Sequence, residues 1–324
     1  MMGSLDGATN HQPNDERNAV RVLIAQDDEA TRMQLQALLP KLGYEVSVAQ
    51  DGADAWRLLQ GEDPPLLAIL DRLMPGLDGV QVCRNVRASP QPGVYILMLT
   101  VSGEQHDLIA GMEAGADDYL TKPFDADELR VRLKAGERIL ELRQELRARA
   151  TYDPLTGILN RRAILELLRR ELAHVARNET SVAVILADLD RFKQINDAHG
   201  HPVGDAVLCE AARRLAAPLR GHDAVGRYGG EEFLIVLRGC DAANALLIAE
   251  RVRCSVGGGH VNTSAGAVAI TVSLGVAIAE PGQAPTLDAL MLAADEALYR
   301  AKAGGRNRAE GPPRGVDLSG STSH

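Results

Sequence analysis

The sequence has 324 residues, which is enough for two domains that each bury a core of their own. Hydrophobic residues make up 45% of the chain and charged residues 24%, as is typical of globular protein, and this excludes a low-complexity chain. The net charge of −9 argues against nonspecific nucleic-acid binding, so no nucleic-acid partner is expected.

Both ends of the chain are polar. Residues 1–18 and 310–324 are rich in Gly, Ser, Asn or Asp, which predicts disorder. No apolar run approaches the roughly 20 residues that a membrane span needs, and the N-terminus lacks the apolar core of a signal peptide. The four cysteines lack metal-binding spacing. These features predict a cytoplasmic protein without a membrane partner.

Short apolar runs alternate with helical patterns in the first part of the chain. Continuous apolar runs indicate strands that are buried on both faces, and strand–helix alternation predicts an α/β fold with a doubly wound, five-stranded parallel sheet. The expected strands are Val20–Ala25, Tyr44–Ala49, Leu66–Leu70, Val94–Thr100 and Asp117–Thr121. The expected helices lie near 30–40, 52–60, 79–88 and 104–114.

Polar side chains follow several of these strands. Asp27 and Asp28 come after the first strand, and Asp71 follows the third. Because the carboxyl ends of parallel strands share one sheet edge, the carboxylates should meet there, and their repulsion predicts a Mg²⁺ site. Thr100 and Lys122 end two further strands, where a hydroxyl and an ammonium group can contact phosphate oxygens.

Residues 19–136 resemble the receiver domain of two-component response regulators. The resemblance rests on VLIAQDDEATR, LDRLMPGLDG, MLT and GADDYLTKPF. It implies that a sensor histidine kinase supplies a phosphoryl group to Asp71, and that Asp27, Asp71 and the Leu73 carbonyl bind Mg²⁺. It also implies a cis peptide bond before Pro123 and a set of switch residues, namely Thr100, Tyr119 and Lys122.

One position departs from that family. Receivers usually carry two acids after the first strand, whereas the first of these positions is Gln26 here. A neutral amide is a weaker Mg²⁺ ligand than a carboxylate, which predicts a lower metal affinity or a slower phosphorylation. Asp28 is a candidate to compensate. The alternative is a receiver that is no longer phosphorylated.

Residues 125–150 are expected to form one long linker helix. Its apolar side chains follow a 4-3-4 spacing, which predicts a short coiled-coil seam and a homodimer. The seam residues are Ala135, Ile139, Leu142 and Leu146. Only about two heptads are present, and Gly136 weakens the middle, so a plain connecting helix is the alternative.

A second domain is expected over residues 151–309, with mixed α/β structure and an antiparallel hairpin around Gly229-Gly230. Its expected strands are Val182–Ala187, Ala224–Tyr228, Phe233–Leu237, Ala267–Ser273 and Val276–Ile278. Its expected helices lie near 160–177, 203–219, 241–256 and 286–302.

The second domain also carries clustered polar residues. Asp188 ends an apolar strand, and Glu231 and Glu232 follow the two hairpin glycines. Carboxylates from a strand end and a hairpin can together hold Mg²⁺, or Mn²⁺ as the alternative ion, beside a triphosphate. Asn196 and Asp205 suit the guanine edge, which presents hydrogen-bond donors. Cations for the phosphates are Lys193, Lys302 and Arg306. The set favours phosphoryl or nucleotidyl transfer from GTP.

Residues 151–309 resemble the GGDEF family of diguanylate cyclases. The matching strings are DPLTGILNRR, DLDRFKQINDAHGHPVGD, RYGGEEF, VSLGVA and ADEALYRAKAGGRNR. The resemblance implies a nucleotidyl-cyclase palm-like fold and two facing domains that each hold one GTP. It implies Asp188, the Leu189 carbonyl and Glu231 as metal ligands, with Glu231 or Glu232 deprotonating the attacking 3′-OH. Further implied roles are guanosine binding by Asn196, His201 and Asp205, transition-state stabilisation by Lys193, phosphate binding by Lys302 and Arg306, and packing beneath the site by Phe192.

An RxxD string, Arg220 to Asp223, precedes the hairpin motif. In the resembled family an RxxD string at this offset binds cyclic di-GMP and inhibits the enzyme, and Arg227 is a candidate third member. The alternative is a solvated charge pair.

The sequence therefore predicts a diguanylate cyclase that condenses two GTP into cyclic di-GMP. Phosphorylation of the receiver is expected to activate it through dimerisation or dimer rearrangement. The alternatives are a noncatalytic nucleotide-binding effector and a cyclase with a mononucleotide product.

Overall fold

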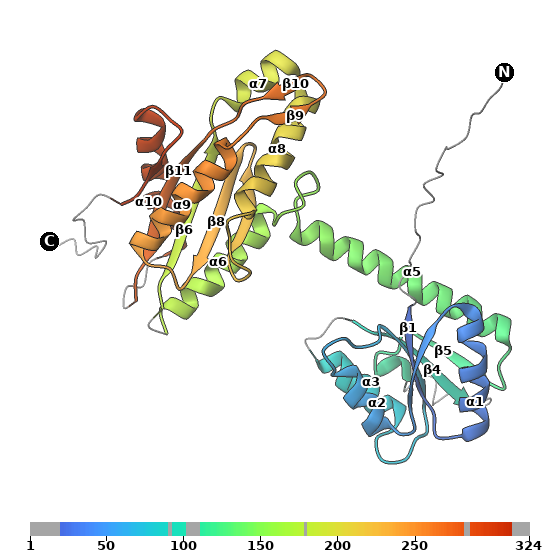
Figure 1. Ribbon diagram of the computed structural model, residues 1–324. Helices are drawn as coiled ribbons and strands as arrows, with labels where there is room; N and C mark the ends of the chain where they lie inside the picture. Colours follow the sequence, from blue (N-terminus) through green and yellow to red (C-terminus); the bar gives the residue numbers. More distant parts are fainter. Residues whose placement is uncertain (1–19, 90–92, 102–110, 178–179, 282–285, 313–324) are drawn as a thin grey trace, which may run out of the picture. The chain divides into compact units, whose positions relative to one another are not determined.

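The computed structural model describes residues 20–89, 93–101, 111–177, 180–281 and 286–312. The chain divides after Gln144 into two units, and each is a layered α/β structure (Figure 1). The ends that were expected to be disordered lie outside the described residues, except for 310–312 at the second end. Of these, Glu310 belongs to a short strand, so regular structure extends one residue into the expected tail.

The first unit contains a five-stranded parallel sheet with the order β2-β1-β3-β4-β5, which confirms the predicted doubly wound sheet. Each strand begins and ends within one residue of its prediction, because the apolar runs mark segments buried on both faces. The strands are β1 (Arg21–Ala25), β2 (Glu45–Ala49), β3 (Leu67–Asp71), β4 (Tyr95–Val101) and β5 (Asp118–Lys122).

Helices cover both faces of this sheet. One face packs against α1 (Glu29–Leu38) and the beginning of α5 (Ala126–Thr151), and the other against α2 (Gly52–Leu59) and α3 (Gly79–Ala88). The short 3-10 helix η1 (Pro40–Leu42) follows α1. The helix predicted near 104–114 lies largely outside the described residues, although 111–113 are helical.

Helix α5 shows why a glycine occurs within the expected seam. A Cβ atom at Gly136 would lie 2.7 Å from the Tyr95 ring, so glycine is needed for α5 to approach β4 closely. Beyond this contact the apolar side chains become exposed, from 36% at Ile139 to 66% at Leu146. No helix in the described parts of the chain is long and apolar enough to cross a bilayer.

The second unit contains a five-stranded sheet with the order β12-β11-β6-β8-β7. Only the β11–β12 pair is parallel, and the β7–β8 pair forms the predicted hairpin. The strands are β6 (Val182–Leu189), β7 (Ala224–Gly229), β8 (Glu232–Arg238), β11 (Val272–Ala279) and β12 (Ala309–Glu310). A separate two-stranded sheet pairs β9 (Val261–Thr263) with β10 (Gly266–Val268).

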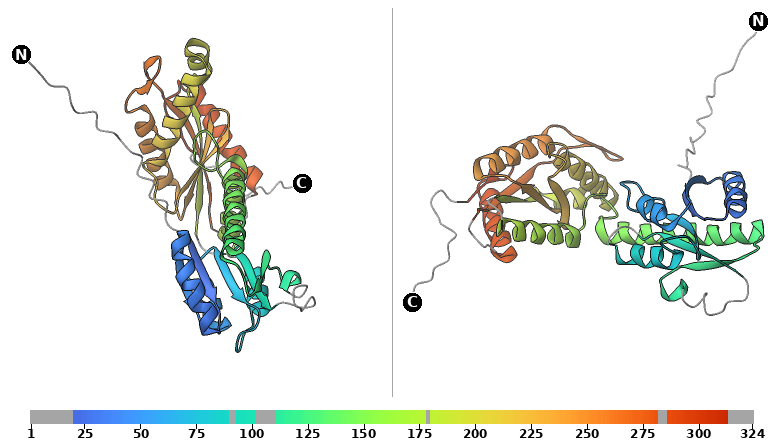
Figure 2. Two further views of the ribbon diagram at one scale, coloured as in Figure 1. Left: turned by 90° about the vertical axis from the view of Figure 1, so that its right-hand side faces the viewer. Right: turned by 90° about the horizontal axis from the view of Figure 1, so that it is seen from below.

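Helices also lie on both faces of the second sheet, as the right-hand view of Figure 2 shows. Helices α8 (His201–Ala216) and α9 (Ala242–Gly257) pack on one face, and α6 (Arg161–Val175) and α10 (Leu287–Ala303) on the other. These four helices agree with the predicted helical segments. The structure also contains the short helix α7 (Phe192–His199), which the sequence analysis did not predict.

The predicted boundaries of the strands Ala267–Ser273 and Val276–Ile278 are wrong. The first segment falls partly in β10, and the second belongs to one uninterrupted strand, β11. Gly275 lies inside β11 and serves close packing. A Cβ atom there would lie 2.2 Å from the carbonyl oxygen of Ala294 in α10, so only glycine lets the helix backbone approach the strand.

Candidate active site and phosphoacceptor pocket

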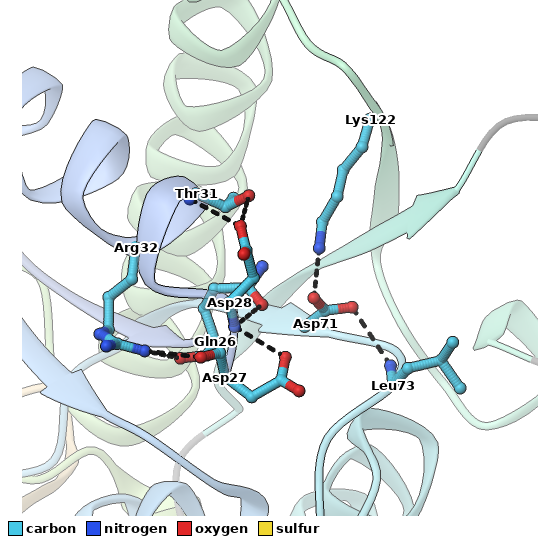
Figure 3. Close-up of polar contacts among 8 residues, drawn as sticks. All are labelled: Gln26, Asp27, Asp28, Thr31, Arg32, Asp71, Leu73 and Lys122. Atoms are coloured by element: carbon cyan, nitrogen blue, oxygen red, sulfur yellow. Dashed lines mark hydrogen bonds and ion pairs between the residues drawn. The ribbon is translucent and has the colours of Figure 1, made fainter.

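Asp71 ends β3 at the carboxyl edge of the first sheet and is only 5% exposed. Its carboxylate forms an ion pair with Lys122 of β5 and accepts a hydrogen bond from the Leu73 N–H at 3.2 Å (Figure 3). Strand β4 lies between β3 and β5 and places the buried Thr100 at the same edge. The bond between Lys122 and Pro123 is cis, as predicted. The structure therefore brings the expected residues together.

Figure 3 shows that the residues after β1, Gln26, Asp27 and Asp28, make different contacts. The Asp28 carboxylate caps α1, since it accepts hydrogen bonds from the Thr31 N–H at 2.8 Å and the Thr31 hydroxyl at 2.6 Å. These bonds lower the pKa of Asp28. Asp28 is thus committed to the helix, and Asp27 is the acid that can act with Asp71.

Gln26 is fully buried beside this edge. Its Oε1 accepts a hydrogen bond from the Asp28 N–H at 3.0 Å, while its Nε2 has no hydrogen-bond partner among the described residues. The amide therefore supplies no negative charge where receivers usually have an acid. Of the groups expected to hold a cation at this edge, the carboxylates are those of Asp27 and Asp71, with the Leu73 carbonyl as the neutral ligand.

Tyr119 contacts the helix that leaves the first unit. The Arg132 guanidinium of α5 lies 5.4 Å from the centre of the Tyr119 ring, which is a cation–π distance. Arg132 also donates hydrogen bonds to both carboxylate oxygens of Asp118, at 2.7 and 2.9 Å. The predicted switch residue is therefore in direct contact with α5.

In the second unit, Asp188 lies near the end of β6 and pairs in register with Glu232 of β8. The Leu189 N–H donates to the Glu231 carbonyl oxygen at 3.3 Å. Gly230 adopts a φ of 48°, a left-handed conformation that turns the hairpin and that glycine adopts readily. The three acids predicted from separate motifs thus meet at one sheet edge.

The charges at this edge interact strongly. Burial raises the pKa of Asp188, and Glu231 adds to the rise. The Lys302 ammonium of α10, 2.7 Å from the Asp188 carboxylate, opposes it. Burial also raises the pKa of Glu232, with Asp188 as a further cause. A divalent cation would relieve this repulsion.

The donor set for such a cation is small. Among the described residues, no group of three or more acidic, histidine or cysteine side chains is placed to hold a metal ion. The Asp188 and Glu231 carboxylates could bind a hard cation only with a backbone oxygen such as the Leu189 carbonyl and with ligand or solvent oxygens. That composition fits Mg²⁺, which usually takes one or two protein carboxylates plus phosphate and water.

Helices α7 and α8 bring the predicted guanine-binding residues together. Asn196 lies on α7, while His201 begins α8 and precedes Asp205 by about one turn. Asn196 Oδ1 is buried and has no hydrogen-bond partner in the described part of the chain, and a Cβ atom at Gly204 would lie 1.9 Å from it. Glycine at 204 therefore permits the close approach of Asn196 to α8.

Three further predicted residues lie around these helices. Phe192 begins α7 and is 7% exposed within the core, as expected of a residue beneath the site. Lys193 is exposed on the same helix. Arg306 follows α10 and has a φ of 65°, in the left-handed region that nonglycine residues seldom adopt.

The structure connects Arg227 to the β7–β8 hairpin. Its guanidinium lies 3.3 Å from Asp153 and donates to the Gly230 carbonyl oxygen at 2.9 Å. Within the part of the chain that is described, no hydrogen bond or ion pair joins Arg227 to Arg220 or Asp223.

Arg220 and Asp223 form a compact turn. The Arg220 N–H donates to the Asp223 carboxylate, and the Asp223 N–H donates to the Arg220 carbonyl oxygen, both at 3.0 Å. The Arg251 guanidinium of α9 donates to the nearby Pro218 carbonyl oxygen at 2.9 Å, which adds a second cation near this turn. Sequence reasoning missed Arg251 because no local motif links it to Arg220.

Two family models match the chain. Residues 22–134 match the response regulator receiver domain, and residues 150–308 match the diguanylate cyclase GGDEF domain. Over 301 residues the chain is 33% identical to the response regulator PleD of Caulobacter vibrioides, covering 90% of this chain and 65% of PleD. It is 42% identical over 168 residues to the diguanylate cyclase DgcM of Escherichia coli, covering 52% of this chain and 40% of DgcM. The chain thus spans less than two thirds of each relative.

A solved structure is also similar to the second unit. It contains the coiled coil and GGDEF domain of DgcB from Caulobacter crescentus in complex with c-di-GMP. The sequences are 31% identical, and the match has a TM-score of 0.52. It covers 58% of this chain and 100% of that chain.

Proposed function

Because the chain belongs to the receiver family through residues 22–134 and to the GGDEF family through residues 150–308, we propose that it is a receiver-controlled diguanylate cyclase. Two GTP molecules would condense to cyclic di-GMP, forming two phosphodiester bonds and releasing two pyrophosphates. The observation that carries the proposal is the meeting of Asp188, Glu231, Glu232 and Lys302 at one sheet edge.

Each side chain of the site has a proposed role that follows from its position. Asn196, His201 and Asp205 would hold the guanosine, and Lys302 and Arg306 the terminal phosphates. The raised pKa of Glu232 suits it to accept the proton of the attacking 3′-OH, and the neighbouring Glu231 is the alternative base. Lys193 would stabilise charge that develops at the α-phosphate. Each domain supplies one half-site, so turnover requires a homodimer.

Asp188, Glu231 and the Leu189 carbonyl are the proposed ligands of Mg²⁺, or of Mn²⁺ in its place. When bound, the cation neutralises phosphate charge and polarises the α-phosphate. The close acids and the raised pKa of Asp188 support this assignment.

Incubation of the full chain with GTP and Mg²⁺, followed by mass analysis of the products, tests the proposal. Cyclic di-GMP and pyrophosphate are the expected products. A cyclic mononucleotide would indicate the alternative cyclase, and binding of GTP without pyrophosphate release would indicate a noncatalytic effector. Glu231→Gln should abolish product formation while leaving the fold intact.

We further propose that a sensor histidine kinase phosphorylates Asp71 and that this rearranges or stabilises the dimer. The ion pair between Asp71 and Lys122 supports the assignment, because a phosphoryl group would compete for the same ammonium. Thr100 and Tyr119 would change position together with Lys122 when Asp71 is phosphorylated. Tyr119 contacts Arg132 of α5.

The turn of Arg220 and Asp223 is the proposed site of product inhibition. A guanidinium and a carboxylate suit the phosphate and guanine of cyclic di-GMP, and Arg251 offers a second guanidinium nearby. Arg220→Ala should keep the initial rate and remove inhibition by added cyclic di-GMP. Undiminished inhibition in that variant would exclude the site.

A further inference from the structure

Asp190 lies two residues after Asp188 and is 7% exposed, yet it has no part in the chemistry above. One carboxylate oxygen accepts a hydrogen bond from the Ser273 hydroxyl at 2.6 Å. The other accepts from the Thr271 hydroxyl at 2.7 Å and from the backbone N–H of Asn307 at 3.0 Å. This carboxylate therefore joins the end of β6 to the start of β11 and to the loop after α10.

That loop has an unusual backbone. Gly305, Arg306 and Asn307 have φ values of 112°, 65° and 47°, so three successive residues adopt left-handed conformations. Two of them have side chains, and such residues keep this conformation only where their surroundings hold it. Asp190 holds the Asn307 N–H, and the Arg253 guanidinium donates to Asn307 Oδ1 at 2.9 Å.

Asp190 also borders a cavity of about 440 Å³ that Arg191 and Arg306 line. Arg191 has a φ of 58°, so left-handed turns occur both directly after Asp190 and in the loop that Asp190 holds. Arginine suits phosphate oxygens, so the two arginines in the lining are compatible with a phosphate ligand. The position of Arg306 in this cavity depends on the Gly305–Asn307 loop, whose left-handed conformation residues with side chains seldom adopt.

We infer that Asp190 is a positioning residue, which holds the Gly305–Asn307 loop so that Arg306 presents its guanidinium to the β- and γ-phosphates of GTP. The inference rests on the proposed function. It assigns Asp190 an effect on triphosphate binding that is transmitted through Arg306, with no direct contact to the nucleotide. A carboxylate that only stabilised the fold would affect all nucleotides alike.

The test uses the full chain and measures calorimetric affinities with Mg²⁺ present. The probes are 3′-deoxy-GTP, which cannot condense, and GMP, which lacks the β- and γ-phosphates. Asp190→Asn should weaken binding of 3′-deoxy-GTP roughly tenfold, the size expected when a hydrogen bond to a charged group is lost, and leave GMP binding unchanged. In an Arg306→Ala background, Asp190→Asn should cause no further loss.

Ser273→Ala removes one partner of Asp190 and should show the same pattern with a smaller loss, which keeps the test available if Asp190→Asn does not fold. Glu296→Gln, an acid-to-amide change at an exposed position of α10, is the matched control and should change neither affinity.

Equal weakening of 3′-deoxy-GTP and GMP, unchanged binding of both, or additive losses with Arg306→Ala would overturn the inference. If the wild-type chain binds neither nucleotide, the proposed function fails instead, so the two failures are distinguishable.

Discussion

Asp153, in the turn after α5, shows how one side chain supports the β7–β8 hairpin. Its carboxylate accepts hydrogen bonds from the Thr156 N–H at 2.9 Å and the Thr156 hydroxyl at 2.7 Å, and it pairs with Arg227. Burial alone would raise the pKa of Asp153, but these hydrogen bonds and the Arg227 charge outweigh burial and lower it. Since Arg227 also holds the Gly230 carbonyl, the charged form of Asp153 stabilises the hairpin.

Asp153→Asn should therefore lower the free energy of unfolding by about 1–2 kcal/mol at pH 7, the scale of hydrogen bonds to a charged group. A carboxyl group whose pKa is lower in the folded state stabilises that state above its unfolded pKa of 3.8, and the stabilisation is lost as the pH falls through the folded value. Urea titrations between pH 7 and pH 3.5 should show a constant difference above about pH 5 that narrows below it. A difference that is independent of pH would contradict this account.

At the scale of elements, the junction of α7 and α8 brings together residues that are proposed to bind guanine. A Cβ atom at Gly204 would lie 1.9 Å from Asn196 Oδ1 and 3.3 Å from the Phe192 ring. The helices can adopt this spacing only because residue 204 has no side chain.

Gly204→Ala should destabilise the chain by about 1–3 kcal/mol through overpacking and should raise the KM for GTP by displacing Asn196. Thermal unfolding and initial rates measure the two effects. Gly259→Ala is the matched control, because a Cβ atom there meets nothing within 4 Å. Similar results for the two variants would show that the contact with Asn196 is unimportant.

The exposed seam of α5 is a second feature at this scale. Leu142 and Leu146 are 50% and 66% exposed, which leaves apolar surface that a second copy of the helix could cover.

Leu146→Asp should raise the dissociation constant of the dimer by at least roughly tenfold, because each leucine contributes about 1.5–3 kcal/mol when buried. Sedimentation velocity measures this dissociation constant, and the rate of cyclic di-GMP formation should fall as the dimer is lost. Gln144→Asp adds the same charge off the seam and should have little effect. Dimerisation that survives Leu146→Asp would place the interface elsewhere.

At the scale of the whole molecule, helix α5 is the link through which the proposed control of the second unit by the first would act. Helix α5 is continuous across the division between them, and its first turns carry Arg132, which contacts Tyr119. A change at Asp71 can therefore reach β5 through the ion pair with Lys122, and α5 follows β5 along the chain into the second unit.

Acetyl phosphate or beryllofluoride should raise the rate of cyclic di-GMP formation by the wild-type chain by about 5- to 150-fold, the usual range of allosteric coupling. Asp71→Asn should not respond, whereas Asp54→Asn, at a surface acid of α2, should respond like the wild type. Rate and oligomeric state are measured together. An Asp71→Asn protein that matches the activated wild type in both would refute control through Asp71.

The local patterns of the sequence determined most of the fold. Apolar runs mark buried strands whatever surrounds them, so all five strands of the first sheet were predictable, and with them the position of Asp71 and Lys122 at one sheet edge. The acids Asp188, Glu231 and Glu232 were also predictable, since contiguous motifs place them at strand ends.

Only the tertiary structure decided the features that depend on distant segments. The two strands predicted on either side of Gly275 proved to meet in one strand, in which the glycine packs closely against α10, and Asp28 proved to cap α1. Arg227 proved to bind Asp153, and Asp190 proved to hold the loop of Arg306. Local sequence carries the preference of a segment for helix or strand. The fold decides which segments come into contact. These contacts determine which group pairs with a buried charge and where only glycine fits.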